Sequence, residues 1–104
     1  MKYLFILTTA LLTSCGVATK TPDKISTIVQ ASCGTCNFEM TSDACELAIE
    51  LNGKHYFVEG SSIDEHGDAH SEKGLCSLIR DAQVIGQVKH GVFVAEKFEL
   101  IKLN

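Results

Sequence analysis

The sequence contains no tryptophan and only one proline, Pro22. Without tryptophan, a hydrophobic core has to be built from aliphatic side chains and a few phenylalanine and tyrosine rings. No apolar run reaches the roughly 20 residues that a membrane-spanning helix needs. With 104 residues and no internal repeat, the chain has room for one small domain.

Basic residues are scarce: 9 Lys and Arg stand against 13 Asp and Glu, which makes the net charge −4 at pH 7. A nucleic-acid partner would require a basic face for its phosphates, so we exclude that class. The sequence also lacks a serine nucleophile elbow and a glycine-rich phosphate loop. We therefore expect a protein that is not an enzyme. The acidic balance is compatible with a cation or a basic partner.

The N-terminus has the pattern of an export signal. Met1 and Lys2 form a short basic segment, and residues 3–12 are an apolar run of about ten residues. The run ends at Leu-Thr-Ser-Cys15-Gly, which resembles the bacterial lipoprotein signal, where cleavage precedes a cysteine that is then acylated. We expect residues 1–14 to be removed and Cys15 to anchor the protein in the bacterial envelope, at the outer membrane facing the periplasm.

The polar residues 15–24 are interpreted as a tether, followed by a single domain over residues 25–104. Within the domain, residues 25–32 predict a first strand. Residues 33–43 are expected to form a loop.

A β-hairpin is predicted over residues 45–59 by the alternation of apolar residues on both sides of Asn-Gly at 52–53. Asn-Gly favours a two-residue type I′ turn, so Ile49 should face Tyr56. The residues expected to face the core are Cys45, Leu47, Ile49, Leu51, Tyr56 and Val58.

The segment after the hairpin shows helical signals. A capping-box pattern predicts one helical turn over residues 62–66, ended by Gly67. Either Asp68 or Ser71 could cap a second helix that continues through Arg80.

Two final strands are predicted over residues 82–89 and 92–103, joined by a His-Gly turn at 90–91. The apolar phase of the last strand changes between Val94 and Phe98, which indicates a bulge or a bend. The element order predicts a mainly β protein, a small five-stranded OB-like barrel with one helix between strands 3 and 4. An open α+β sheet is the alternative.

Metal-ligand side chains are concentrated in two parts of the chain. Tetrahedral zinc takes four Cys or His ligands, and copper(I) takes soft thiolates. The sequence therefore predicts a copper or zinc site built from Cys33, Cys36, Cys45, Cys76, His66 and His70.

The same residues fit other interpretations. In an oxidising compartment the four cysteines after Cys15 could form two disulfides, and three connectivities are open. The histidines, Asp64 and Asp68 would then hydrogen-bond within their loop. Cys-Gly-Thr-Cys also has the spacing of thioredoxin-type redox sites, although residues 37–42 predict a poor helix. Acid–base pairs for hydrolysis among residues 64–70 are a further alternative.

Two motifs carry a resemblance to known proteins. Cys-Gly-x-Cys-x-Phe at residues 33–38 and Ile-Asp-x-His-Gly-Asp-Ala-His at residues 63–70 resemble a family of short, uncharacterised bacterial lipoproteins. The similarity covers nearly the whole domain, and the His-Gly-Asp-Ala-His block is its most specific part. The resemblance implies a complete single domain and implies no particular activity.

These observations predict a lipid-anchored accessory or binding module of the envelope that holds copper or zinc through clustered Cys and His. The alternative is a disulfide-stapled interaction or assembly module without a metal. A thiol redox protein is the third interpretation.

Overall fold

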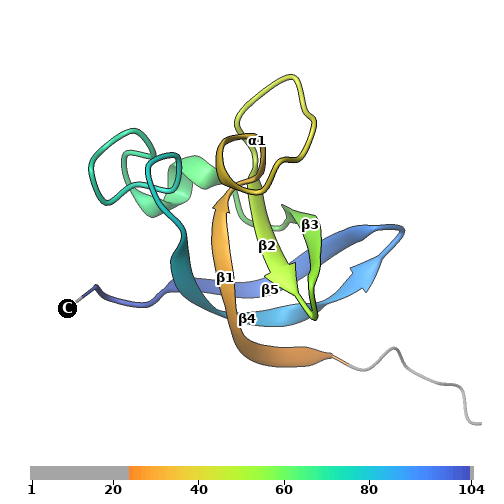
Figure 1. Ribbon diagram of the computed structural model, residues 1–104. Coiled ribbons are helices and arrows are strands. Elements are labelled where there is room, and N and C mark those ends of the chain that lie inside the picture. Colours follow the sequence, from red (N-terminus) through yellow and green to blue (C-terminus); the bar gives the residue numbers. More distant parts are fainter. Residues whose placement is uncertain (1–23, 104) are drawn as a thin grey trace, which may run out of the picture.

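Five strands close into a barrel in the order β1-β2-β3-β5-β4 in the computed structural model, which describes residues 24–103 (Figure 1). The strands are β1 (Ile25–Cys33), β2 (Leu47–Leu51), β3 (Lys54–Glu59), β4 (Arg80–Lys89) and β5 (Val92–Leu100). Strands β3 and β5 pair in parallel, and every other pair is antiparallel. The predicted five-stranded, mainly β barrel is confirmed, and the open α+β sheet was wrong.

The predicted signal at residues 1–14, the predicted anchor Cys15 and all of the tether except Lys24 lie outside the described residues. Within residues 24–103, no helix has both the length and the hydrophobicity that crossing a membrane requires.

Two tight turns set the register of the hairpins. The φ angles are 52° and 80° at residues 52–53, and 52° and 79° at residues 90–91. A type I′ turn needs positive φ at both central residues, and its twist matches that of the strands it joins. As predicted, Ile49 of β2 faces Tyr56 of β3. Strand β2 begins at Leu47, so Cys45 lies just before the strand and not inside it.

Strand β5 contains a bulge at Glu96, because Ile85 of β4 faces Lys97 whereas Gly86 faces Ala95. A side chain at Gly86 would collide with the backbone of β5, so the close approach at the bulge requires glycine. The extra residue shifts the side-chain alternation by one position, which explains the change of phase in the sequence. The residues of β5 that pack in the core are Phe93 and Ala95 before the bulge and Phe98 and Leu100 after it.

The connection between β3 and β4 contains less helix than expected. Its only helical piece within the described residues is a 3-10 turn, Ile63–His66, and Gly67 follows it with φ 91°. The second helix, expected to continue through Arg80, was wrong, because residues 68–79 form turns.

The packing of this loop explains why no second helix forms. The backbone N–H of Cys76 donates to the carbonyl oxygen of Ala69 at 2.9 Å, a closure that a helix could not make. Gly74 is buried where the loop crosses itself, and a Cβ there would collide with the carbonyl oxygens of Asp68 and Ala69. Tertiary contacts therefore override the local helical pattern.

The short helix α1 (Gly34–Asn37) follows β1 directly. Figure 1 shows that α1 and the loop between β3 and β4 lie at the same end of the barrel. The two segments that carry the predicted ligand residues therefore lie at the same end of the barrel.

Candidate metal centre

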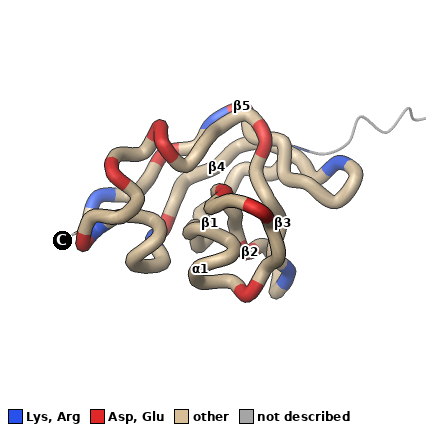
Figure 2. Tube along the Cα trace, turned by 90° about the horizontal axis from the view of Figure 1, so that it is seen from above, with Lys and Arg blue, Asp and Glu red and all other residues tan. Residues whose placement is uncertain are grey.

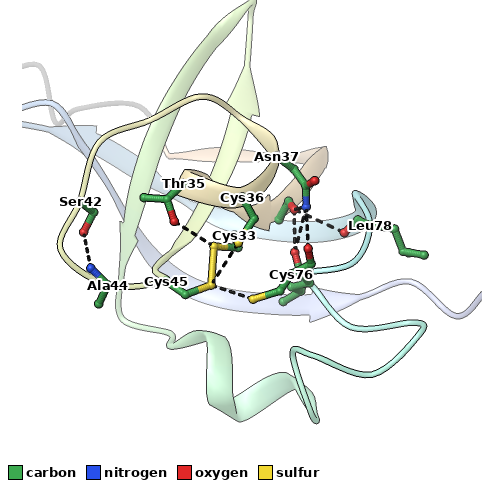
Figure 3. Close-up of a disulfide and its surroundings, with 11 residues drawn as sticks. Cys33, Thr35, Cys36, Asn37, Ser42, Ala44, Cys45, Cys76 and Leu78 are labelled. Atoms are coloured by element: carbon green, nitrogen blue, oxygen red, sulfur yellow. Dashed lines mark hydrogen bonds between the residues drawn. A yellow bond between two sulfur atoms is a disulfide. The ribbon is translucent and has the colours of Figure 1, made fainter.

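Four cysteine sulfurs from separate parts of the chain meet at this end of the barrel (Figure 3). Cys33 is the last residue of β1, Cys36 lies in α1, Cys45 precedes β2, and Cys76 lies in the loop before β4. All four Sγ atoms lie within 4.8 Å of one another. This group is called the sulfur cluster below.

Cys45 has the central position in the sulfur cluster. It forms a disulfide with Cys33, and the two Cα atoms are 5.6 Å apart. Its Sγ also lies 2.7 Å from Sγ of Cys76 and 3.9 Å from Sγ of Cys36, which are both free cysteines. The sequence left three disulfide connectivities open. The Cys33–Cys45 bond excludes the two that pair Cys33 with Cys36 or with Cys76.

The spacing of the sulfurs fits a metal ion. Four thiolates around zinc have Zn–S bonds of about 2.3 Å, which places the sulfurs about 3.8 Å apart at the corners of a tetrahedron. The observed separations extend to at most 4.8 Å, whereas the bonded Cys33–Cys45 pair and the Cys45–Cys76 pair at 2.7 Å are shorter than this spacing. The tetrahedral geometry would therefore require these short pairs to move apart and the longest ones to move about 1 Å closer. Since a disulfide sulfur is not a thiolate, the full set of four ligands exists only when the Cys33–Cys45 bond is reduced.

Exposure to solvent differs among the four cysteines. Cys33 is fully buried, Cys45 and Cys76 are half-buried, and Cys36 is exposed. The cluster therefore has a protected side in the barrel and an open side at Cys36.

The backbone around Gly34 connects the Cys-Gly-Thr-Cys turn to the segment that carries Cys45. The N–H of Gly34 donates to the carbonyl oxygen of Glu46 at 2.9 Å. A Cβ at Gly34 would lie 2.8 Å from Phe57 and 2.9 Å from Met40, closer than side chains normally approach. Glycine at this position therefore allows α1 to lie against β2 and β3.

The loop that carries Cys76 is held by two polar side chains. Ser32 is fully buried, and its hydroxyl donates to the carbonyl oxygen of Leu75 at 2.7 Å. Asn37 donates from Nδ2 to Oγ of Ser32 at 2.7 Å and to the carbonyl oxygen of Cys76 at 3.3 Å. These contacts hold the Cys76 backbone beside β1 and α1 (Figure 3).

Sequence reasoning did not identify Ser32 and Asn37 as part of the site. Ser32 lies on the outward-facing row of β1, and it is buried only because the loop from β3 to β4 covers it. Such long-range coverage has no signal in local periodicity. Their position directly beside the Cys-x-x-Cys motif was the one available indication.

The surroundings of Cys76 disfavour its negatively charged form. Burial raises the pKa of the Cys76 thiol, and interactions with Cys36 and the negative charges of Asp64 and Asp68 raise it further. Figure 2 shows that acidic residues are spread over the barrel and its loops. A cation at the cluster would reverse this electrostatic preference, because it attracts both thiolates and carboxylates.

The structure places neither predicted histidine ligand in the sulfur cluster. The His66 ring lies against Phe98, with 4.9 Å between centroids, and its Nε2 is 2.7 Å from Oγ of Ser61. His70 is exposed, and its backbone N–H donates to Oδ1 of Asp68 at 3.0 Å.

A surface groove with a volume of about 480 Å³ opens beside the cluster. Cys45 forms part of its wall together with apolar residues of β2 and β3. Three carboxylates also line it, those of Glu46, Glu59 and Asp64, and no lysine or arginine does. The approach to the cluster from this side is therefore acidic.

Comparison with known proteins assigns the chain to a family. Residues 27–101 match DUF6370, a family of unknown function, and the chain belongs to that family. No curated protein and no solved structure matches significantly. The expected membership of an uncharacterised family is thus confirmed, whereas the match does not test the lipoprotein signal.

Replacing Ser32 should loosen the loop that carries Cys76. Ser32→Ala removes two hydrogen bonds, the one to the carbonyl oxygen of Leu75 and the one from the amide of Asn37, and we expect a loss of about 1–3 kcal/mol in the free energy of unfolding. Urea unfolding measures this. The control is Ser26→Ala, an exposed position in the same strand, with an expected change below about 0.5 kcal/mol. Equal losses in both variants would contradict the role of Ser32.

The environment of His66 should make stability depend on pH. Burial lowers the pKa of His66 from 6.5, and the positive charge of Arg80 lowers it as well. The negative charge of Glu65 raises this pKa, but the two lowering effects together are larger. The unfolded chain therefore binds the proton first, so this stability is complete above pH 6.5 and is lost as pH falls through the folded-state pKa.

Thermal unfolding between about pH 7.5 and about pH 5.5 tests the effect in wild type and His66→Gln. The melting temperature should fall more steeply towards acid in the wild type. If the melting temperatures of the two proteins fell equally with pH, His66 would not be the source of the pH dependence.

Proposed function

We propose that the reduced protein is a metal-binding accessory module of the bacterial envelope, which holds copper(I) or zinc through Cys33, Cys36, Cys45 and Cys76. The observation that carries this proposal is the convergence of four Sγ atoms within 4.8 Å. The protein would act by binding and not by catalysis.

The chemistry of the donors limits the metal. Four sulfur ligands favour a soft or borderline ion, and carboxylate-preferring ions such as Mg²⁺ or Ca²⁺ are poor matches. Zinc would use all four thiolates, whereas copper(I) accepts fewer. The absence of histidine from the cluster supports a purely sulfur-based set within the described residues.

The disulfide between Cys33 and Cys45 favours a second candidate function, a stapled interaction or assembly module without a metal. In that case the acidic groove beside Cys45 would be the partner surface. Two free cysteines, Cys36 and Cys76, support the metal proposal over this alternative, because a purely structural staple does not require free thiols beside it.

The proposed location rests on the N-terminal sequence. Several acyl chains at the N-terminus would hold the protein on a membrane stably, whereas a single chain would bind only reversibly. Acylation of Cys15 would supply these chains. We propose the outer membrane, facing the periplasm, where the barrel would be exposed to envelope metals and thiols.

Metal binding is tested on the full chain with Cys15→Ser, which removes the one cysteine that precedes the cluster. After anaerobic reduction, we expect native mass spectrometry to find one zinc or copper(I) ion per chain. The metal should also protect the four cluster thiols from alkylation. Cobalt(II) in place of zinc should show the charge-transfer absorption of thiolate ligands.

Single Cys→Ser changes at Cys36 or Cys76 should weaken zinc binding by about tenfold or more, since each removes a ligand. His70→Ala is the control and should bind as the parent protein does. If all four cluster thiols were still alkylated in the presence of stoichiometric metal, metal binding by the cluster would be contradicted.

The anchor is tested in the native bacterium. The wild-type protein should fractionate with membranes and carry a lipid mass on Cys15, whereas Cys15→Ser should appear in the soluble fraction. Retention of Cys15→Ser on membranes would show that another feature localises the protein.

A further inference from the structure

We propose that the sulfur cluster is a redox-gated metal site, in which formation of the Cys33–Cys45 disulfide releases the metal and reduction of that bond restores binding. This inference rests on the proposed function and names its regulation. The oxidant would be another disulfide, either a small molecule such as oxidised glutathione or an exposed disulfide of a protein.

The position of Cys45 provides the first argument. Its Sγ is bonded to Cys33 and lies 2.7 Å from Sγ of Cys76 and 3.9 Å from Sγ of Cys36. Thiol–disulfide exchange requires a thiolate to reach a disulfide sulfur, and two cysteines have this access to Cys45. The bond can therefore move among partners without a large backbone change.

The exposure of the cysteines provides the second argument. Cys36 is the one exposed member of the cluster, and Cys33 is fully buried. An external disulfide can therefore meet Cys36 but not Cys33. The final Cys33–Cys45 bond includes the buried Cys33. The external disulfide therefore reacts first at Cys36, a cysteine that is not part of the final bond.

These two features define a balanced reaction in three displacements. First, the thiolate of Cys36 attacks one sulfur of the external disulfide, and one external thiolate leaves. Second, the thiolate of Cys45 attacks Sγ of Cys36, which releases the second external thiolate. Third, the thiolate of Cys33 attacks Sγ of Cys45 and frees Cys36 again.

The sum of these steps transfers two electrons from Cys33 and Cys45 to the external disulfide. The two external thiolates take protons from solvent. Cys36 ends as it began, and Cys76 is unchanged.

The oxidised cluster no longer has the ligands of a four-coordinate site. Cys36 and Cys76 are its remaining thiols, and the sulfurs of the Cys33–Cys45 disulfide are poor ligands because the thiolate is the binding form. The protein described by the structure corresponds to this oxidised state. Metal binding and the disulfide therefore exclude each other.

The first experiment follows both events in one sample. The full chain with Cys15→Ser is reduced, loaded with zinc and titrated with oxidised glutathione. A chromogenic chelator reports free zinc, while alkylation and peptide mass spectrometry locate the disulfide. We expect one zinc released for each Cys33–Cys45 bond formed, and reduction should restore one binding site.

A second experiment measures the route on metal-free reduced protein. Cys36→Ser should slow oxidation by glutathione disulfide about tenfold or more, because the exposed entry point is lost. His70→Ala is the control, because it changes an exposed side chain that lies outside the sulfur cluster and outside the route. Its oxidation rate should stay within about twofold of the parent rate. Circular dichroism establishes that both variants are folded.

The outcomes separate the two proposals. Zinc that stays bound after the Cys33–Cys45 bond has formed would overturn the gating and leave metal binding intact. Equal oxidation rates for the parent and Cys36→Ser would overturn the route through Cys36. Failure of the reduced chain to bind zinc or copper(I) would overturn both the proposed function and the gating.

Discussion

The carbonyl oxygen of Leu75 is the point on which the arrangement of the cysteines depends. It accepts hydrogen bonds from the backbone N–H of Cys33 at 2.9 Å and from the hydroxyl of Ser32 at 2.7 Å, although 43 residues separate Ser32 from Leu75. Leu75 is 1% exposed, and in such an interior hydrogen bonds are strong and unpaired groups are costly. These bonds hold the neighbouring Cys76 beside the end of β1. Without them, Cys76 would belong to a surface loop with no fixed relation to the other sulfurs.

The barrel supplies a rigid frame for the remaining cysteines. Strand β1 pairs with β4 up to Ala31 and with β2 as far as Cys33, so β2 and the hydrogen bond from the N–H of Cys33 to Leu75 hold the end that carries Cys33. A disulfide from Cys33 to Cys45 joins this end to the segment that precedes β2. A metal ion would join those same segments and add α1 and the loop of Cys76. Either sulfur chemistry would thus stabilise the same end of a small domain, so the barrel would stay folded in both proposed states.

Charge adds a preference for cations at this site. The carboxylates of Asp64 and Asp68 disfavour the Cys76 thiolate, and the neighbouring groove is lined by three carboxylates. In a protein that carries a net charge of −4, the cluster would attract metal ions and repel anions. A positive ion at the cluster would offset the repulsion between thiolates and the nearby carboxylates, whereas a disulfide carries no charge. Either proposed state would avoid this repulsion.

The five strands, the two tight turns and the barrel could be predicted from the sequence. Alternation around Asn-Gly at 52–53 predicted the pairing of Ile49 with Tyr56, and the phase change near Phe98 predicted the bulge, because these features depend on neighbours along the chain or across a short turn. Which candidate ligands meet depends instead on the three-dimensional fold. It brought the four cysteines together, separated His66 and His70 from them, and replaced the expected helix before Arg80 by turns. The reason is physical: the path of this loop is set by buried hydrogen bonds to residues far away in the chain, and local periodicity carries no record of such partners.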